Sequence, residues 1–370
     1  MPRAAALALT VLALTLTPHR ARADINATSW MRDDAIRDKP IASLVLPGTH
    51  DSGTAWLSRE LLPGSDSQLP KWATEAVNAA ERFGLPADDV VRRWAKAQTL
   101  TIGEQLRRGA RYVDLRCGWT PDGEWRTHHA LIGRMVDELL EEVKVFLVEN
   151  PSEVVIVEMT HFFGGPRAED VERLATVVEE IFGELLAPYP GSTKAMYDMK
   201  VKDFVDANHR AIVVFEDDRT AAEWKFWPAR TITNTYADTD DENGMENFNR
   251  EVVRDFNKPS FAADAILKLS WTLTTQPKTV IEALDIFKRY PRNLLQLADR
   301  ANARLSAFTV DATNNHCSVA NIIVVDDLAN SDVLEVVARL NAVGASERGR
   351  CAWTTSSSSP RVAIERRKLL

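Results

Sequence analysis

Cysteine is scarce in this sequence, and the scarcity limits how the fold is held together. The 370 residues include only three cysteines, at positions 117, 317 and 351. Three cysteines allow one intramolecular bridge at most, so disulfides are not the main source of stability. We expect Cys317 to pair with Cys351, because Cys117 follows an apolar strand and is expected to be buried as a small apolar residue. No cluster of cysteine and histidine has the spacing of a zinc site.

Excess positive charge and long apolar runs are also missing. The formal net charge is -8 and the pI is about 5.5, which argues against nucleic acid as a partner. Outside the N-terminus, no segment approaches the ~20 apolar residues of a transmembrane helix. Ten tryptophans leave open a docking role at a membrane surface, although core packing is the commoner role of tryptophan.

The first 23 residues have the pattern of a secretory signal peptide. Arg3 precedes an apolar run over residues 4–16, and Ala21-Arg22-Ala23 fits the small-x-small cleavage pattern. We therefore expect cleavage after Ala23 and a secreted, extracellular protein. No Gly/Ser-rich or Pro-rich linker divides residues 24–370, so we expect one large domain with a C-terminal tail over 346–370.

The chain is organised around the segment Ser43–Gly53, which reads SLVLPGTHDSG. Its apolar run is expected to be a buried strand that breaks at Pro47-Gly48 and then presents His50 and Asp51 side by side. Taken alone, His50 could equally be a structural histidine in a hydrogen-bonded turn, without a catalytic role. Two further segments change this interpretation.

Strand periodicity groups further polar residues with this segment. In GARYVDLR, alternation places Asp114 and Arg116 on one face of a strand. The segment WRTHHA then supplies His128 and His129, one of which must face the same way. Two histidines and an arginine are what phosphodiester cleavage needs, because they accept a proton, return a proton and hold the phosphate.

Together, PGTHDSG, GARYVDLR and the histidine pair resemble the X domain of the phosphatidylinositol-specific phospholipases C. The form is the compact one shared by bacterial enzymes and X-domain-only proteins, and the resemblance extends from about Ile41 to about Asp326. It implies a single irregular TIM-like (βα) barrel. The alternation of expected strands and helices after Thr101 independently favours an α/β fold of this kind.

The resemblance implies a role for each histidine and its carboxylate. His50 corresponds to the general base and His129 to the general acid, with His128 as the competing candidate. Ala130 stands where the family usually has glycine after the acid histidine. Asp51 would pair with the acid histidine and raise its pKa.

The remaining site residues are assigned in the same way. Asp326 would orient His50, with Asp327 as the alternative, because the two lie on opposite faces of a strand end. Asp114 is expected to steady Arg116 and to touch the substrate. Tyr236, in an Asn-Thr-aromatic segment similar to that of X-domain-only proteins, is a candidate for the pocket wall.

Arg116 also decides the expected metal dependence. In calcium-dependent relatives this position is a second carboxylate, whereas here a guanidinium supplies a permanent cation for the phosphate. Thr160 stands where those relatives carry another carboxylate. The resemblance therefore implies a metal-independent enzyme with no cofactor, acting as a monomer on a phospholipid at a membrane surface.

Three alternatives remain open at this stage. Residues 56–100 are expected to form one or two inserted helices, either as a lid over the site or as packing helices without a role in turnover. A metal-dependent phosphodiesterase of the glycerophosphodiester or sphingomyelinase-D type would share the barrel, but it would need several carboxylates around Mg²⁺. A non-catalytic exported binding protein on the same scaffold is the third reading.

Overall fold

The computed structural model describes residues 26–62, 86–256, 265–283, 291–316 and 320–342, with a few isolated positions between 74 and 84. The expected signal peptide, the expected pairing of Cys317 with Cys351 and the C-terminal tail lie outside these residues. Cys117 is free and buried, as predicted. Among the described residues, no helix is long and apolar enough to span a bilayer.

Parallel strands form the wall of an irregular barrel. They are β1 (Leu46–Thr49), β3 (Tyr112–Trp119), β6 (Val155–Phe163), β7 (Ala211–Phe215), β8 (Trp227–Pro228), β9 (Ile232–Thr235), β10 (Ile266–Trp271) and β11 (Ile322–Val325). Their order in the sheet is β8-β7-β6-β3-β1-β11-β10-β9. β1, the first strand along the chain, therefore pairs with β11, the last strand along the chain. In the part of the chain that is described, β8 and β9 do not pair, and the wall is open there. The prediction of an irregular TIM-like barrel is confirmed.

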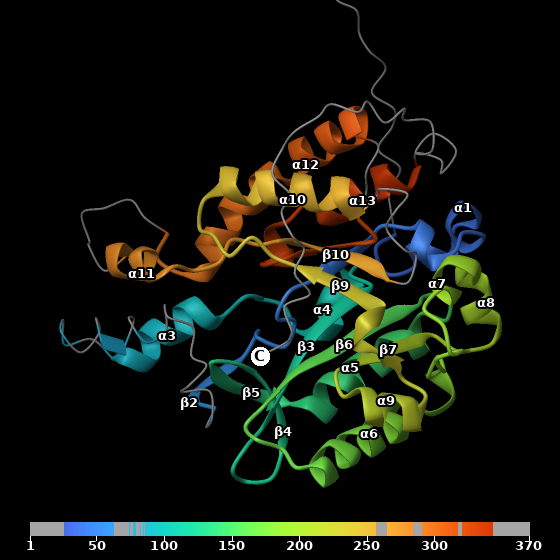
Figure 1. Cartoon of the computed structure of the whole chain (residues 1–370), viewed down its shortest axis with the longest axis horizontal. Coiled ribbons are helices and arrows are strands. Elements are labelled where there is room, and N and C mark those ends of the chain that lie inside the picture. Colours follow the sequence, from blue (N-terminus) through green and yellow to red (C-terminus); the bar gives the residue numbers. More distant parts are fainter. Residues whose placement is uncertain are drawn as a thin grey trace, which may run out of the picture.

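An antiparallel extension rises from one side of this wall. The end of β3 pairs with β4 (Trp125–His129), β4 pairs with β5 (Leu131–Met135), and β5 pairs with β2 (Leu57–Leu61). Strand β2 lies in the segment for which only helices were expected. Helix α3 (Ala87–Ala95) lies beside β2 (Figure 1), and the isolated described positions 74, 77, 78 and 82 of the same segment are also helical.

Helices cover the outside of the barrel in two groups (Figure 1). Helices α5 (Val136–Glu149), α6 (Ala168–Phe182) and α9 (Asp218–Trp224) lie on one side, where α5 and α6 pack on the outward apolar face of β3, β6 and β7. On the other side, α10 (Glu242–Phe256), α12 (Leu294–His316) and α13 (Val333–Ala342) cover β1, β10 and β11. Helix α4 (Ile102–Arg107) leads into β3 and begins with a capping box of Thr101 and Glu104.

Shorter elements complete the described chain. They are η1 (Trp30–Arg32), α1 (Asp34–Arg37), η2 (Ile41–Ser43), η3 (Gly183–Leu185), α7 (Ala195–Asp198), α8 (Val201–Asp206), η4 (Ala229–Thr231), α11 (Pro277–Ala283) and η5 (Leu328–Asn330). The expected strand over the apolar run before Pro47 is wrong in its bounds. Residues 41–43 form a 3-10 turn, and β1 runs through Pro47 and Gly48.

Gly48 explains why the strand continues. A Cβ at this position would lie 2.8 Å from Cδ1 of Tyr112 and 2.8 Å from Cγ1 of Val324. Real Cβ atoms do not approach other heavy atoms this closely, so the strand tolerates only glycine between these two side chains. The Pro-Gly pair therefore serves close packing inside the barrel and not a turn.

Candidate active site

His50 and Asp326 lie together at the carboxyl ends of neighbouring strands. His50 directly follows β1, and Asp326 directly follows β11. Nδ1 of His50 lies 2.8 Å from Oδ1 of Asp326, whose side chain is almost fully buried. Asp327 turns away and accepts a hydrogen bond from Oγ1 of Thr99 at 2.8 Å. The structure thus places Asp326, and not Asp327, against His50.

Asp51 lies at the centre of a cluster that it forms with His50, Arg116 and His129. Its backbone has a positive φ of 44°, which turns the fully buried carboxylate back over the end of the barrel. Oδ1 forms an ion pair with Nε of Arg116, and Oδ2 lies 3.3 Å from Nδ1 of His129 and 3.5 Å from Nε2 of His50. Asp51 therefore connects both histidines and the guanidinium.

Arg116 also contacts a histidine directly. Its Nη2 lies 3.2 Å from Nε2 of His50. Because Nδ1 of His50 faces Asp326, Nε2 is the ring nitrogen that faces Arg116 and is placed to take up or release a proton. The ion pair of Arg116 was expected with Asp114 but is with Asp51, because the left-handed backbone of Asp51 brings its carboxylate over β3.

The two adjacent histidines of β4 face opposite sides. The ring of His129 lies 6.5 Å from that of His50, centroid to centroid, and its Nδ1 donates to the carbonyl oxygen of Ala95 at 2.7 Å. His128 is buried, and its Nε2 donates to the carbonyl oxygen of His161 at 2.9 Å. His129 is therefore the member of the pair that shares a site with His50, and α3 supplies one of its contacts.

Electrostatics differ between the two site histidines. Burial lowers the pKa of His50, but Asp51 and Asp326 raise it more, to about 9. Burial also lowers the pKa of His129, and here Asp51 offsets the effect only in part. The expectation that Asp51 keeps the pKa of His129 high is therefore wrong for the free site, because desolvation outweighs the single carboxylate.

The neighbouring charged groups also shift the pKa values of the carboxylates and of Arg116. Burial would raise the pKa of Asp51, but Arg116 and the two histidines hold it well below its usual range. Burial raises the pKa of Asp326, and His50 opposes this. Arg116 is only partly buried, and Asp51 and then Asp114 raise its pKa against the effect of desolvation, so the guanidinium is a permanent charge.

Asp114 lies beneath this cluster on β3. Its Oδ2 accepts a long hydrogen bond of 3.4 Å from the backbone N–H of Asp51. Its Oδ1 is buried and has no hydrogen-bond partner among the described residues. A buried carboxylate oxygen without a partner is costly, and such atoms are explained by a ligand or by water.

The donor set fits a metal ion poorly. Among the described residues, His50, Asp51 and Asp114 are the group whose candidate ligand atoms lie within 4.8 Å of one another. Calcium takes six to eight oxygen ligands, whereas this group offers two carboxylates, one of them already paired with Arg116. Thr160 is buried and adds no carboxylate. We assign no metal ligand here.

Two further side chains belong to the surroundings of the site. Tyr236 follows β9, is 55% exposed, and lies close enough to Arg116 to act on its pKa. His161 was not singled out from the sequence. It has a positive φ of 58°, and burial and then Arg116 lower its pKa to about 3, so its imidazole is neutral. A histidine near the carboxyl end of a barrel strand, here β6, was the signal available for it.

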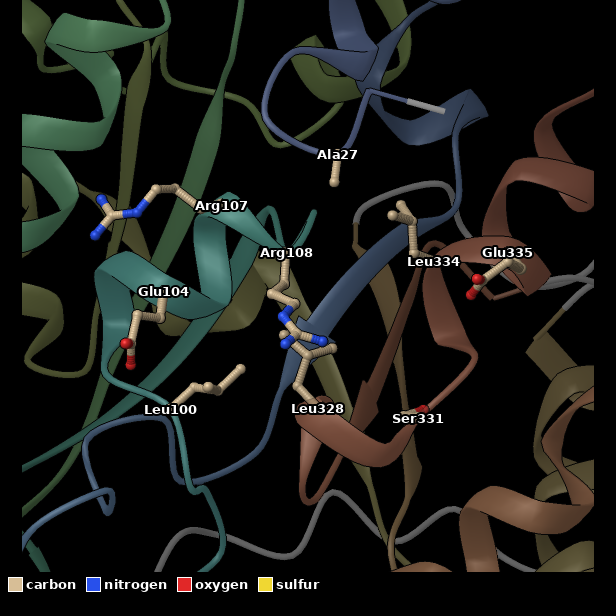
Figure 2. Close-up of a pocket in the computed structure, with 9 residues that line it drawn as sticks. All are labelled: Ala27, Leu100, Glu104, Arg107, Arg108, Leu328, Ser331, Leu334 and Glu335. Carbon is tan, nitrogen blue, oxygen red and sulfur yellow. The ribbon is translucent and has the colours of Figure 1, made fainter. Parts of the chain in front are cut away.

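A separate cavity of about 420 Å³ lies on the outside of the barrel, between α4 and α13. The side chain of Arg108 extends into it toward Leu328 (Figure 2). None of the residues that line it belongs to the cluster around Asp51. This cavity is therefore distinct from the site at the strand ends.

Known proteins resemble this chain in sequence. Residues 90–214 match the family model for phosphatidylinositol-specific phospholipase C, X domain. PI-PLC X domain-containing protein 3 from Homo sapiens is 25% identical over 328 residues, which cover 86% of this chain and 95% of that protein. PI-PLC X domain-containing protein 1 from Mus musculus is 30% identical over 197 residues, which cover 52% of this chain and 54% of that protein.

Solved structures resemble it in fold. The phosphatidylinositol-specific phospholipase C from Listeria monocytogenes aligns with a TM-score of 0.54 at 14% identity, covering 85% of this chain and 98% of that chain. A phosphatidylinositol-specific phospholipase C from S. aureus aligns with a TM-score of 0.53 at 15% identity, covering 84% and 97%. At these identities the likeness shows the fold alone.

Proposed function

We propose that this chain is a phosphodiester hydrolase of the phospholipase C type, because residues 90–214 match the phosphatidylinositol-specific phospholipase C X domain and X-domain-containing proteins resemble 86% of the chain. Its substrate would be a phosphoinositide-like lipid or the corresponding glycerophosphodiester. Cleavage would pass through a cyclic phosphate formed by the hydroxyl next to the phosphorylated carbon.

The observation that carries this proposal is the continuous set of contacts from Asp326 to His129. Asp326 orients His50, Arg116 contacts His50, and Asp51 links Arg116 to His129. Each histidine thus has its own carboxylate, and a fixed cation lies next to both. Acid-base cleavage of a phosphodiester needs these three functions in one place.

Each side chain has one role in the proposed reaction. Nε2 of His50 takes the proton of the attacking hydroxyl, while Asp326 stabilises the imidazolium that forms. Arg116 holds the phosphoryl oxygens with bidentate donors. His129 gives a proton to the leaving glycerol oxygen. In the second step His129 withdraws a proton from water and His50 returns one, which opens the cyclic phosphate.

Protonation sets the pH range of this reaction. The reactive form has neutral His50 and protonated His129, the reverse of what their pKa directions favour in the free site. A bound phosphodiester adds a negative charge beside His129 and raises its pKa. The proposed enzyme therefore retains one proton on the histidine pair across its active range and loses it near pH 9.

Charge stabilisation without a metal is part of the proposal. Arg116 occupies the position where a divalent ion would approach Asp51, and two cations at this distance would repel each other. We expect activity to survive excess chelator for this reason.

Exposed apolar side chains support action at a lipid surface. Trp56, in the loop after Asp51, is 53% exposed, and Tyr236 is 55% exposed. Aromatic side chains of this kind favour the interface of a bilayer. We further propose that the protein is exported and acts as a monomer. The N-terminal sequence of the secreted protein tests export, with Asp24 as the expected first residue. The native mass of the secreted protein tests the monomer.

The test is an activity assay with matched histidine variants. Purified protein is assayed with phosphatidylinositol, glycosyl-phosphatidylinositol and glycerophosphodiesters, with and without chelator. His50→Gln should be inactive, while His209→Gln, placed before β7 at the other end of the barrel, should retain full activity. Equal activity of the two variants, or none with any phosphodiester in the wild type, would contradict the proposal.

A further inference from the structure

A buried ion pair crosses the interior of the barrel below the candidate site. Nζ of Lys268 on β10 lies 2.5 Å from Oε2 of Glu158 on β6, and the two side chains are 4% and 5% exposed. Strands β10 and β6 are not neighbours in the sheet, so the pair joins opposite parts of the wall. The hydroxyl of Tyr112 donates to the same carboxylate oxygen.

The surrounding packing fixes this arrangement. Nζ of Lys268 lies 5.5 Å from the ring centroid of Tyr112, within the range of a cation–π contact. Gly48 leaves the space that the Tyr112 ring occupies. The glycine of the PGTH segment therefore supports both the catalytic loop and the ion pair beneath it.

Stability alone does not account for a buried lysine here. A buried ion pair is often no more stabilising than apolar side chains of similar volume, because both charges lose their hydration. The interior around it contains such apolar residues, among them Ile156, Val214 and Val324. A charged pair at this position therefore indicates a role in the site above it.

That role concerns Asp114. Asp114 and Glu158 are register partners on adjacent strands, and both side chains point into the barrel. Two carboxylates side by side repel each other unless a cation lies between them. Arg116 is already paired with Asp51, so Lys268 supplies this cation.

We propose that Lys268 is a positioning residue, which keeps the Asp114 carboxylate charged and aimed so that Oδ1 can accept a hydrogen bond from a hydroxyl of the bound head group. This inference rests on the proposed function for the identity of the ligand. The unpartnered Oδ1 of Asp114 is the observation that points to the ligand. Lys268 itself contacts Glu158 and not the substrate.

Charges around Asp114 support the assignment. The charged and titratable groups that face it are His50, Asp51, Tyr112, Arg116, Glu158, His161 and Lys268. Burial would raise the pKa of Asp114, but Lys268 and then His50 lower it below its ordinary value. Burial lowers the pKa of Lys268, and Glu158 and Asp114 raise it more, so the ammonium remains charged.

A double-mutant cycle tests whether Lys268 acts through Asp114. Lys268→Met should lower kcat/KM about 10- to 100-fold, the effect of losing one hydrogen bond to a charged group. In an Asp114→Asn background the same change should cost less than about 3-fold, since the carboxylate is already absent. Lys202→Met, which removes a surface lysine paired with Asp38, is the control and should leave kcat/KM unchanged.

A purely structural role gives a different result. In that case Lys268→Met would cost the same factor in both backgrounds, and the proposal would be overturned. If Lys268→Met does not fold, Lys268→Gln removes the charge but keeps a hydrogen-bond donor for Glu158. This variant should fold and still show the coupling to Asp114→Asn.

A second readout does not depend on turnover. Carboxyl carbon NMR of Asp114 should show its pKa rising in Lys268→Met relative to wild type. An unchanged pKa would overturn the inference even if the wild type cleaves phosphatidylinositol. A raised pKa in a protein that cleaves no phosphodiester would retain the electrostatic role and refute the proposed function instead.

Discussion

Replacing Asp326 by asparagine should shift the pH range of the reaction. The side chain keeps its shape but loses the charge that lies 2.8 Å from Nδ1 of His50. Asp51 and Asp326 together raise the pKa of His50 from 6.5 to about 9 against the effect of burial. An opposite charge in contact is worth roughly 1 to 3 pKa units, so Asp326→Asn should lower the pKa of His50 by about 1 to 2 units.

The sign of the effect on activity follows from the proton count. The histidine pair must hold one proton, and it loses that proton as the pH rises through the pKa of His50. The alkaline limb of kcat/KM should therefore move from about pH 9 in the wild type to roughly pH 7 to 8 in Asp326→Asn. A shift of 1 to 2 units corresponds to about 1.4 to 2.7 kcal/mol.

The assay is the pH dependence of kcat/KM on a water-soluble inositol phosphodiester, which avoids effects of pH on lipid surfaces. Asp327→Asn is the matched control, because Asp327 is the adjacent buried carboxylate but binds Thr99 and Asn330 instead of His50. Its alkaline limb should stay where the wild type has it. An unmoved limb in Asp326→Asn, or equal shifts in both variants, would refute the assignment of His50 as the base.

Two further predictions concern the histidines and the barrel interior. His50→Gln and His129→Gln should each lose about 10²–10⁴-fold in kcat, with little change in melting temperature. An activity loss that follows unfolding would make these side chains structural. His128→Gln is the comparison variant within the same strand. Gly48→Ala should destabilise the fold by about 1–3 kcal/mol in denaturant unfolding, because the added Cβ meets Tyr112 and Val324 at 2.8 Å; an unchanged midpoint would contradict the packing given for β1.

Local sequence patterns predicted the parts of the site that depend on strand alternation. His50 and Asp326 each directly follow an apolar strand, and Arg116 alternates with apolar residues along β3, so their meeting at one end of a barrel follows from the parallel order of the strands. These features need only neighbours along the chain.

Other features needed contacts between distant segments. Strand β2 forms only against β5, and the partners of Arg116 depend on the positive φ of Asp51. The pairing of Lys268 with Glu158 requires the barrel to bring opposite walls together. Pro47 and Gly48 were read as a turn because the residues that surround Gly48 come from β3 and β11. None of these contacts can be predicted from a short segment of the sequence, because each joins residues that are distant along the chain.

The measurement that tests the central claim most directly is phosphorus NMR of purified protein with phosphatidylinositol in excess chelator. The account predicts a cyclic inositol phosphate as the first product, formed at the same rate with and without chelator, because Arg116 supplies the charge that stabilises the transition state. Arg116→Asp should be nearly inactive in the same experiment. Wild-type turnover that stops with chelator and returns with Ca²⁺ or Mg²⁺ would contradict the role of Arg116 and place the reaction among the metal-dependent phosphodiesterases.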